Sequence, residues 1–261
     1  GVTVYDPTGY YLSHPLEIIL PFSMEGGQMK FHGISGMSYH GGLIGTVVAL
    51  VIFMKVKKLD ILEWGDMLVA GIPLGYTFGR LSDFFDGELY GRITRLPWGI
   101  VFPNAEGFPV KARWVQDFAA AVGLPLPSSG VVNLPRHPSQ LYEALFEGIV
   151  LWVVLWFFAR KRRPYKGFVI ASYLIGYGVL RFFLEYARQP DQGIGFPVTL
   201  TPLRDPSQFS PFNFTAGQIL NLLMVIAGVA CLFAFRARAR QVRVQPNERA
   251  PSGRRLRKLL K

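Results

Sequence analysis

Residues 140–159, QLYEALFEGIVLWVVLWFFA, form an apolar run long enough to cross a lipid bilayer, yet the run contains two glutamates. Crossing about 30 Å of hydrocarbon takes roughly 20 mostly apolar residues in a helix. Four further segments, 41–56, 64–85, 167–187 and 215–235, are similarly apolar, and the second and third of these each contain an arginine. The sequence therefore predicts an all-α polytopic membrane protein with five visible transmembrane helices.

The composition supports a membrane protein. Half of the 261 residues are hydrophobic, 17% are charged, and the mean hydropathy is +0.27, whereas soluble domains carry about a quarter charged residues. The net charge of +11 could indicate nucleic-acid binding. Because the basic residues gather in short runs beside apolar segments, we expect a membrane-flanking role and no nucleic-acid partner. The single cysteine, Cys231, excludes an internal disulfide and a cysteine-based metal cluster.

Three basic clusters predict the orientation of the spans. Lysine and arginine favour cytoplasmic loops, and with five alternating crossings all three clusters fall on one side of the membrane. The start of the chain, residues 86–139 and residues 188–214 then lie outside. The clusters are Lys55, Lys57 and Lys58; Arg160, Lys161, Arg162, Arg163 and Lys166; and Arg236, Arg238 and Arg240.

This topology divides the chain into five parts. Residues 1–40 are expected to form an extracytoplasmic arm, residues 41–91 the first two spans, and residues 139–236 the last three. Residues 92–138 lack a long apolar run and predict a small extracytoplasmic head of short strands and turns. Residues 237–261 form a basic cytoplasmic tail that we expect to be disordered, because it is rich in arginine and interrupted by proline.

Several ionisable residues are predicted to lie at one depth in the membrane. At about 1.5 Å of rise per residue, Arg80 and Arg181 lie roughly 21 Å from the cytoplasmic ends of their spans, and Glu147 about 20 Å. Glu143 is one turn higher, and His40 lies at the outer end of the first span. Ionisable groups are costly in a bilayer, so such a cluster indicates function. The planar guanidinium of arginine suits the phosphate of a lipid headgroup.

Other interpretations compete with a catalytic cluster. Each arginine could reach the outer interface or pair with Asp83, Glu88 or Glu185. A transporter of anions, or a lipid-binding protein without catalysis, would also use arginines within the membrane. Transporters often have inverted repeats or broken helices at the midplane, and the sequence indicates neither. The four histidines do not follow the spacing of metal ligands, so we expect no metal and no cofactor.

Several blocks of the sequence resemble the prolipoprotein diacylglyceryl transferase family and follow the family's order. The resemblance implies a multi-pass enzyme of the bacterial inner membrane with seven spans, an outside N-terminus and an inside C-terminus. Five of these seven spans are visible, and the chain begins with Gly1 rather than Met. We therefore expect two further spans upstream. The blocks are HGGLIG at 40–45, GR at 79–80 with GELYGR at 87–92, RHPSQLYE at 136–143, GYGVLR at 176–181, RQPD at 188–191 and GQI at 217–219.

The chain departs from the family pattern in two places. Asp83 and Asp86 stand where the family usually has asparagine. Asp83 lies three residues after Arg80, so the two side chains could pair on one helix face. The segment between Glu25 and His40 is longer than usual and contains His32, which we interpret as a loop histidine.

The reaction that the resemblance implies joins the thiol of a lipobox cysteine to the terminal glyceryl carbon of phosphatidylglycerol and releases glycerol phosphate. Negative charge builds on the leaving phosphate, and preorganised arginines in a dry site stabilise such charge. We therefore expect Arg80 to bind the lipid phosphate and Arg181 to hold it or the product. The implied partners are phosphatidylglycerol, the signal-peptide segment with the lipobox of a prolipoprotein, and membrane lipids.

The acceptor thiol also needs a base, because a free cysteine has a pKa of about 8.5. His40 is the expected base, although it could instead only donate a hydrogen bond; Glu143, Glu147 and Glu185 could replace it or orient the arginines. His137 is expected to be a helix-entry element. The remaining expected lipid-binding residues are Tyr177, one turn before Arg181, together with Gly41, Gly42, Asp83, Glu88 and Gly91.

Overall fold

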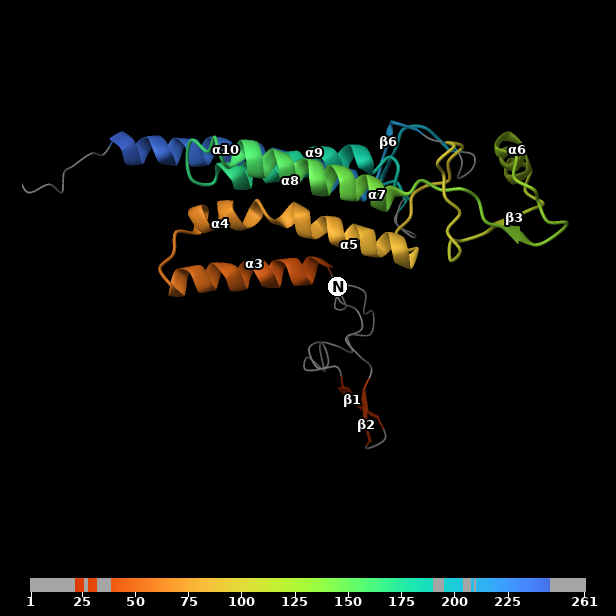
Figure 1. Cartoon of the computed structure of the whole chain (residues 1–261), viewed down its shortest axis with the longest axis horizontal. Helices are drawn as coiled ribbons and strands as arrows, with labels where there is room; N and C mark the ends of the chain where they lie inside the picture. Colours follow the sequence, from red (N-terminus) through yellow and green to blue (C-terminus); the bar gives the residue numbers. More distant parts are fainter. Residues whose placement is uncertain are drawn as a thin grey trace, which may run out of the picture. The chain divides into compact units, whose positions relative to one another are not determined.

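The protein is mostly helical (Figure 1). Its contacts divide the chain into two units, Gly1–Ile61 and Leu62–Lys261. The computed structural model describes residues 22–25, 28–31, 39–189, 195–203, 208 and 210–244.

The first unit contains a hairpin and one apolar helix. Strand β1 (Phe22–Glu25) pairs antiparallel with β2 (Gln28–Phe31). Helix α3 (Tyr39–Val56) covers the first predicted span. Large apolar side chains between Val47 and Val56 are mostly exposed, as expected for a helix that faces lipid. His32 lies outside the described residues.

The second predicted span, 64–85, is two helices and not one. Helix α4 (Ile61–Val69) and helix α5 (Ile72–Asp86) are separated by a turn at Ala70 and Gly71. Pro73, in the first turn of α5, has no N–H group to continue the hydrogen-bond ladder of α4. The expectation that the spans contain no broken helix was therefore wrong here.

The third predicted span is a continuous helical segment, Ser139–Ala159. It consists of α7 (Ser139–Glu143), η2 (Ala144–Val150), α8 (Leu151–Val153) and η3 (Val154–Ala159), where η2 and η3 have the wider turns of a π-helix. The apolar pattern did not predict these turns, because a run that is hydrophobic on all sides does not define a period.

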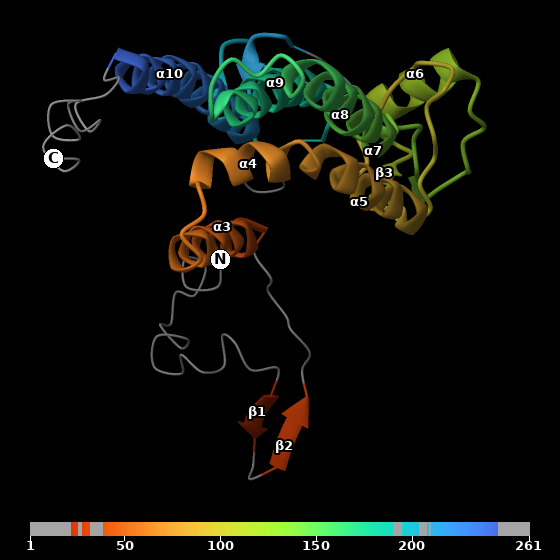
Figure 2. The same ribbon diagram turned by 60° about the vertical axis from the view of Figure 1, so that its left-hand side comes forward.

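The last two predicted spans are also helices. Helix α9 (Phe168–Leu184) packs lengthwise against α10 (Ala216–Val244), as Figure 2 shows. Ser139–Ala159 and Ala216–Gln241 are the described helices long and apolar enough to cross a membrane, and α9 and Gly45–Val56 are shorter apolar helices.

Helix α10 continues well beyond the predicted span. It extends through Arg236, Arg238 and Arg240 to Val244. The expected disorder of residues 237–261 is therefore wrong up to Val244, because alternating alanine and arginine favour a helix. The first proline after this stretch is Pro246.

The segment predicted to be a head of strands and turns also contains a helix. Strand β3 (Phe108–Pro109) pairs antiparallel with β4 (Val131–Val132), and α6 (Arg113–Val122) lies between them in the chain. After α9, β5 (Val198–Thr199) pairs with β6 (Asn213–Phe214).

A small apolar core explains why α6 forms. Val115 and Phe118, three residues apart on one face of α6, are buried with Ile93 and Leu134. Gly123, in the left-handed conformation, ends the helix. This amphipathic pattern is much shorter than a span, so it does not stand out as a long apolar run.

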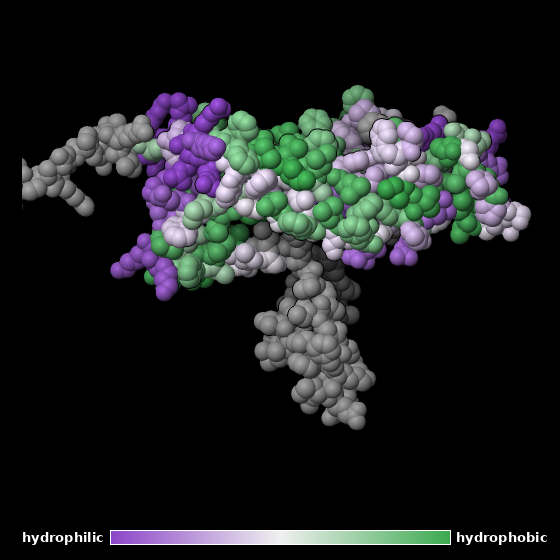
Figure 3. Space-filling view, viewed as in Figure 1, coloured by the Kyte–Doolittle hydropathy of each residue, from purple (hydrophilic) through white to green (hydrophobic). Residues whose placement is uncertain are grey.

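Two of the predicted basic clusters belong to the second unit. Tyr165, in the basic loop after η3, donates its hydroxyl to the Leu232 carbonyl at 3.0 Å, and Gly167 lies against Phe235, the residue before Arg236. Two of the three basic clusters therefore lie at one end of the helices. Figure 3 shows a group of hydrophilic residues around the end of α10, next to an apolar surface.

Candidate active site

Three helical segments of the second unit bring four of the predicted residues together. Glu143, at the end of α7, is fully buried and contacts two arginines: its Oε2 lies 2.9 Å from Arg80 Nε on α5, and its Oε1 lies 3.0 Å from Arg181 Nη1 on α9. Glu147 Oε1, on η2, lies 3.6 Å from the same Arg181 nitrogen. Two positive groups are thus joined through one buried carboxylate.

Each arginine also has a carboxylate partner on its own helix or just after it. Arg80 Nη1 lies 2.8 Å from Asp83 Oδ2, the pairing expected from their spacing. Arg181 Nη2 lies 3.3 Å from Glu185 Oε2. For Arg80 and Arg181, the sequence leaves ion pairing with carboxylates such as Asp83 and Glu185 open as an alternative to phosphate binding. The structure contains these pairs, and Glu143 additionally connects the two arginines.

Two residues of this site were not assigned to it from the sequence. Tyr76 donates its hydroxyl to Glu143 Oε2 at 3.1 Å, and the Arg80 guanidinium lies 4.9 Å from the centre of the Tyr76 ring. Arg188 Nη1 lies 3.7 Å from Glu143 Oε1. Tyr76 is one helical turn before Arg80, so spacing could have identified it. Arg188 follows the end of α9, where no helical period applies.

These residues form a site that we call the arginine–carboxylate cluster. Its four carboxylates outnumber its three arginines, so a phosphate must compete with carboxylates for the guanidinium groups. Glu147 is fully buried, and its Oε2 has no hydrogen-bond partner among the described residues. The cluster consists of Tyr76, Arg80, Asp83, Glu143, Glu147, Arg181, Glu185 and Arg188.

Close packing of α5 against η2 positions Arg80 beside Glu143. A Cβ added to Gly148 would lie 3.2 Å from Thr77 Cα and 3.0 Å from Thr77 Cβ, so glycine allows the two helices to approach. The Thr77 hydroxyl is within hydrogen-bond distance of the Pro73 and Ala144 carbonyls, at 3.1 and 3.4 Å.

Three other predicted residues differ in their relation to the cluster. Tyr177 lies beside it and packs edge-on against Tyr76, with 5.9 Å between the ring centres. Glu88 is exposed, and its carbonyl accepts a hydrogen bond from the Gln140 amide. Gly91 is a packing position, because an added Cβ would lie 2.7 Å from His137 Cβ. The structure does not bring Glu88 or Gly91 to the cluster.

His40, Gly41 and Gly42 belong to α3 in the first unit. The side chain of His40 lies outside the described residues. The roles expected for these residues therefore stay predictions.

His137 has the position of a helix-entry residue. Its backbone N–H donates to the Arg92 carbonyl at 2.9 Å, and its ring Nδ1 lies 3.4 Å from the Tyr142 hydroxyl. Burial, and then the positive charge of Arg92, lowers the pKa of His137 below the ordinary value of histidine. A lowered pKa favours the neutral imidazole, which suits a residue packed at the entry of a helix.

Comparison with known proteins decides the family. A family model described as prolipoprotein diacylglyceryl transferase matches residues 2–234. The chain belongs to this family. Relatives named phosphatidylglycerol–prolipoprotein diacylglyceryl transferase include one from Treponema pallidum, 45% identical over 90% of this chain and 71% of the relative. Those from Treponema denticola and Chlorobaculum tepidum are 44% and 40% identical, over 89% and 92% of this chain and 70% and 69% of the relatives.

The match to the prolipoprotein diacylglyceryl transferase family covers the whole arginine–carboxylate cluster. The cluster begins at Tyr76 and ends at Arg188, well inside the matched range. Within the residues that the structure describes, no group of three or more His, Cys, Asp or Glu side chains is arranged to hold a metal ion.

Proposed function

We propose that this enzyme transfers the diacylglyceryl group of phosphatidylglycerol to the thiol of the lipobox cysteine in a prolipoprotein. The family and the names of the relatives support this reaction. The observation that carries the proposed site is that Arg80 and Arg181, on different helices, both contact the buried Glu143. One phosphate can therefore meet two fixed guanidinium groups.

Arg80 and Arg181 bind the phosphate of the lipid in this proposal. Their side chains are 17% and 13% exposed, whereas Glu143 and Glu147 are 1% and 0% exposed. A ligand can therefore reach the two arginines, whereas the protein covers the two carboxylates. Arginine has five N–H donors, and among the described residues Arg80 uses its Nε and Nη1 for carboxylates, which leaves Nη2 for a phosphate oxygen.

The reaction forms one carbon–sulfur bond and breaks one carbon–oxygen bond. The thiolate sulfur attacks the glyceryl CH₂ carbon that bears the phosphate ester. The electron pair of the broken bond goes to the bridging oxygen, and glycerol phosphate leaves. Fixed donors aimed at developing negative charge lower such a barrier by about 3 kcal/mol each, which is the role assigned to Arg80 and Arg181.

The proton of the acceptor thiol must go to a base. His40 is the proposed base, because an imidazole titrates near physiological pH. Glu147 is the alternative within the arginine–carboxylate cluster, since neither of its carboxylate oxygens has a hydrogen-bond partner among the described residues. Transfer that persists in a His40→Gln variant and is lost in Glu147→Gln would identify Glu147 as the base.

We propose an orientation in the bacterial inner membrane as well. The basic end of α10 and the basic loop after η3 face the cytoplasm, and residues 92–138 form the extracytoplasmic head. The positive-inside rule supports this orientation, as does the gathering of these two clusters at one end of the helices.

A transfer assay tests the proposed function. Membranes with the full-length protein are mixed with labelled phosphatidylglycerol and a lipobox peptide, and the thioether product is measured. We expect Arg80→Ala and Arg181→Ala to abolish transfer, and exposed Glu88→Gln to retain it. A peptide with serine in place of the cysteine should stay unlabelled. Lipid binding without any transfer by the wild type would instead indicate a non-catalytic lipid-binding protein.

A further inference from the structure

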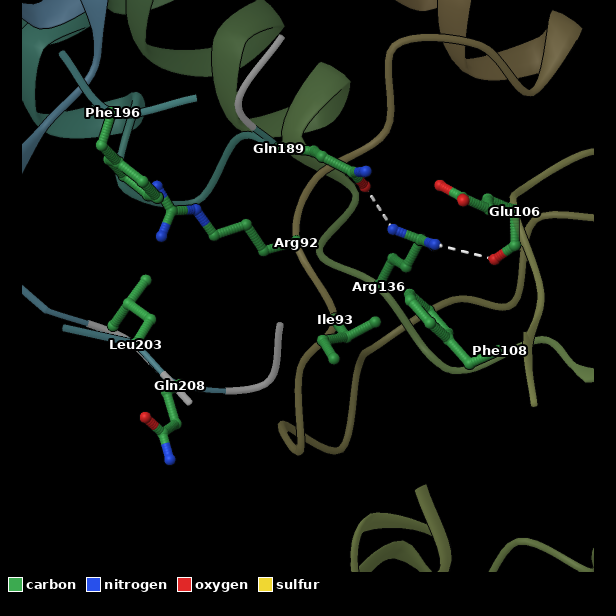
Figure 4. A pocket seen from close by; sticks show the side chains of 9 residues that line it. All are labelled: Arg92, Ile93, Glu106, Phe108, Arg136, Gln189, Phe196, Leu203 and Gln208. Carbon is green, nitrogen blue, oxygen red and sulfur yellow. Dashed lines mark hydrogen bonds between the residues drawn. The ribbon is translucent and has the colours of Figure 1, made fainter. Parts of the chain in front are cut away.

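A second group of arginines lines a cavity of about 320 Å³ beside the predicted head (Figure 4). Arg92 and Arg136 come from residues 92–138, and Gln189 and Phe196 come from the segment after α9. None of these residues belongs to the arginine–carboxylate cluster.

Arg136 is buried, and the hydrogen bonds of its guanidinium go to neutral acceptors, although the Glu106 carboxylate acts on it electrostatically. Its side chain is 1% exposed. Its Nη2 donates to the Glu106 carbonyl at 3.0 Å and its Nη1 to the Gln189 side-chain oxygen, which are both neutral acceptors (Figure 4). Its Nε has no hydrogen-bond partner in the described part of the chain. The guanidinium also lies 4.7 Å from the centre of the Tyr90 ring.

Arg92 has a similar environment. Its Nε donates to the Arg188 carbonyl at 2.9 Å, and its guanidinium lies 5.0 Å from the centre of the Phe196 ring. Burial lowers the pKa of both Arg92 and Arg136, although Glu185 and Glu106 act against this effect. Buried positive charge whose hydrogen bonds go to neutral groups favours an anion.

The cavity adjoins the arginine–carboxylate cluster through one residue. The Arg188 carbonyl accepts the hydrogen bond of Arg92, while the Arg188 guanidinium contacts Glu143 at 3.7 Å. Gln189, the next residue in the chain, lines the cavity. A small anion released at the cluster therefore has a positively charged site close by.

We propose that this cavity binds glycerol phosphate, the product that leaves when the carbon–oxygen bond breaks. The inference rests on the proposed function. The anion is a phosphate monoester on a short polar chain, which suits a small cavity whose polar lining is two arginines, Gln189, Gln208 and one carboxylate, Glu106. Drug-sized ligands occupy pockets of about 300–1,000 Å³, so the cavity has room for glycerol phosphate and lacks room for two acyl chains.

Direct binding tests the site independently of catalysis. The full-length protein in lipid nanodiscs is titrated with glycerol phosphate, with inorganic phosphate as the comparison. We expect Arg92→Gln to weaken binding of glycerol phosphate by about 10-fold or more, the usual effect of losing a charge-assisted hydrogen bond. Arg95→Gln, an exposed arginine of the same segment, is the matched control and should bind like the wild type. Equal affinity in the wild type and Arg92→Gln overturns the proposal.

Product inhibition of the transfer reaction separates the product from the lipid headgroup. We expect Arg92→Gln to raise the inhibition constant of glycerol phosphate by about 10-fold while the KM for phosphatidylglycerol stays unchanged. A parallel rise in that KM would show that the cavity binds the lipid headgroup, and the proposal would be wrong. Arg136→Lys, which keeps the charge, should retain binding of glycerol phosphate. A wild type that binds glycerol phosphate but transfers no lipid would contradict the proposed function and leave the binding result standing.

Discussion

Glu143 has two oxygens, and each contacts a different arginine from a different helix. A buried carboxylate alone would be strongly destabilising, and two buried guanidinium groups facing each other would repel. The three groups stabilise one another because the negative charge lies between the positive ones. A lipid phosphate can also lie between the two arginines. Each guanidinium group can donate some of its N–H groups to the phosphate and the others to carboxylates.

Replacing Glu143 by glutamine should disrupt this arrangement. The amide keeps the size of the side chain but removes the charge that holds Arg80 beside Arg181. Breaking a buried ion pair by removing one partner costs about 3–5 kcal/mol. We expect a large fall in the melting temperature and loss of transfer, measured on the protein in nanodiscs. Wild-type stability and turnover in Glu143→Gln, with Glu88→Gln as the control, would show that Glu143 does not organise the site.

Asp83 competes with phosphate for Arg80, because its carboxylate lies 2.8 Å from Arg80 Nη1. We expect Asp83→Asn to lower the KM for phosphatidylglycerol by about 3-fold, the size of a partly exposed ion pair, with kcat little changed. Asp86→Asn is the matched control, since the Asp86 carboxylate lies 3.4 Å from the Ser82 hydroxyl and has no contact with Arg80 among the described residues. A higher KM in Asp83→Asn would mean that Asp83 helps to bind the lipid.

At the scale of helices, the break at Ala70 and Gly71 allows α4 and α5 to contact different segments of the protein. Asp66 on α4 accepts hydrogen bonds from the N–H groups of Gly167 and Ile170 at the start of α9, at 2.8 and 3.0 Å. Helix α5 instead packs against η2. The break thus separates the residue that caps α9 from the helix that carries Arg80.

Asp66→Ala should destabilise the start of α9. Removal of a helix-capping carboxylate costs about 1–2 kcal/mol, and Asp66 is buried, so water replaces its hydrogen bonds poorly. We expect a clear fall in melting temperature. Glu63→Ala removes a half-exposed carboxylate of the same helix and should have a much smaller effect. Equal effects of the two variants would contradict the capping role.

Gly148→Ala should separate α5 from η2. The added methyl group meets Thr77, and overpacking of this kind costs about 1–3 kcal/mol. Transfer should fall together with stability, because Arg80 moves away from Glu143. Gly75→Ala on α5 is the control, since an added Cβ there has no atom within 4 Å. Melting temperature and turnover of the two variants provide the comparison, and unchanged turnover in Gly148→Ala would show that this contact does not position Arg80.

For the whole molecule, two features of the sequence predicted the arrangement of the helices: the lengths of the apolar runs and the positions of charged residues within them. Long apolar runs predicted the helices, because the length of a bilayer crossing requires them. The depths of Arg80, Glu143, Glu147 and Arg181 in their runs predicted that these residues would meet, since helices of known rise bring equal depths together.

Features that depend on short-range packing were missed. The pattern within a uniformly apolar run does not show where a helix breaks, so the turn before Pro73 and the π turns were not predicted. The core of α6 involves only a few residues, such as Val115 and Phe118. Arg92 and Arg136 line one cavity because tertiary contacts bring together segments far apart in the chain, and no spacing rule predicts such a cavity.

The central claim is that Arg80 and Arg181 hold one phosphate together. A double-mutant cycle tests it most directly: the affinity of the full-length protein in nanodiscs for labelled phosphatidylglycerol is measured with Arg80→Gln, Arg181→Gln and both. We predict that each single variant weakens binding by about 10-fold or more and that the double variant is little weaker than either, because groups that share one ligand are not additive. Full additivity, or unchanged affinity in both single variants, would contradict the shared site.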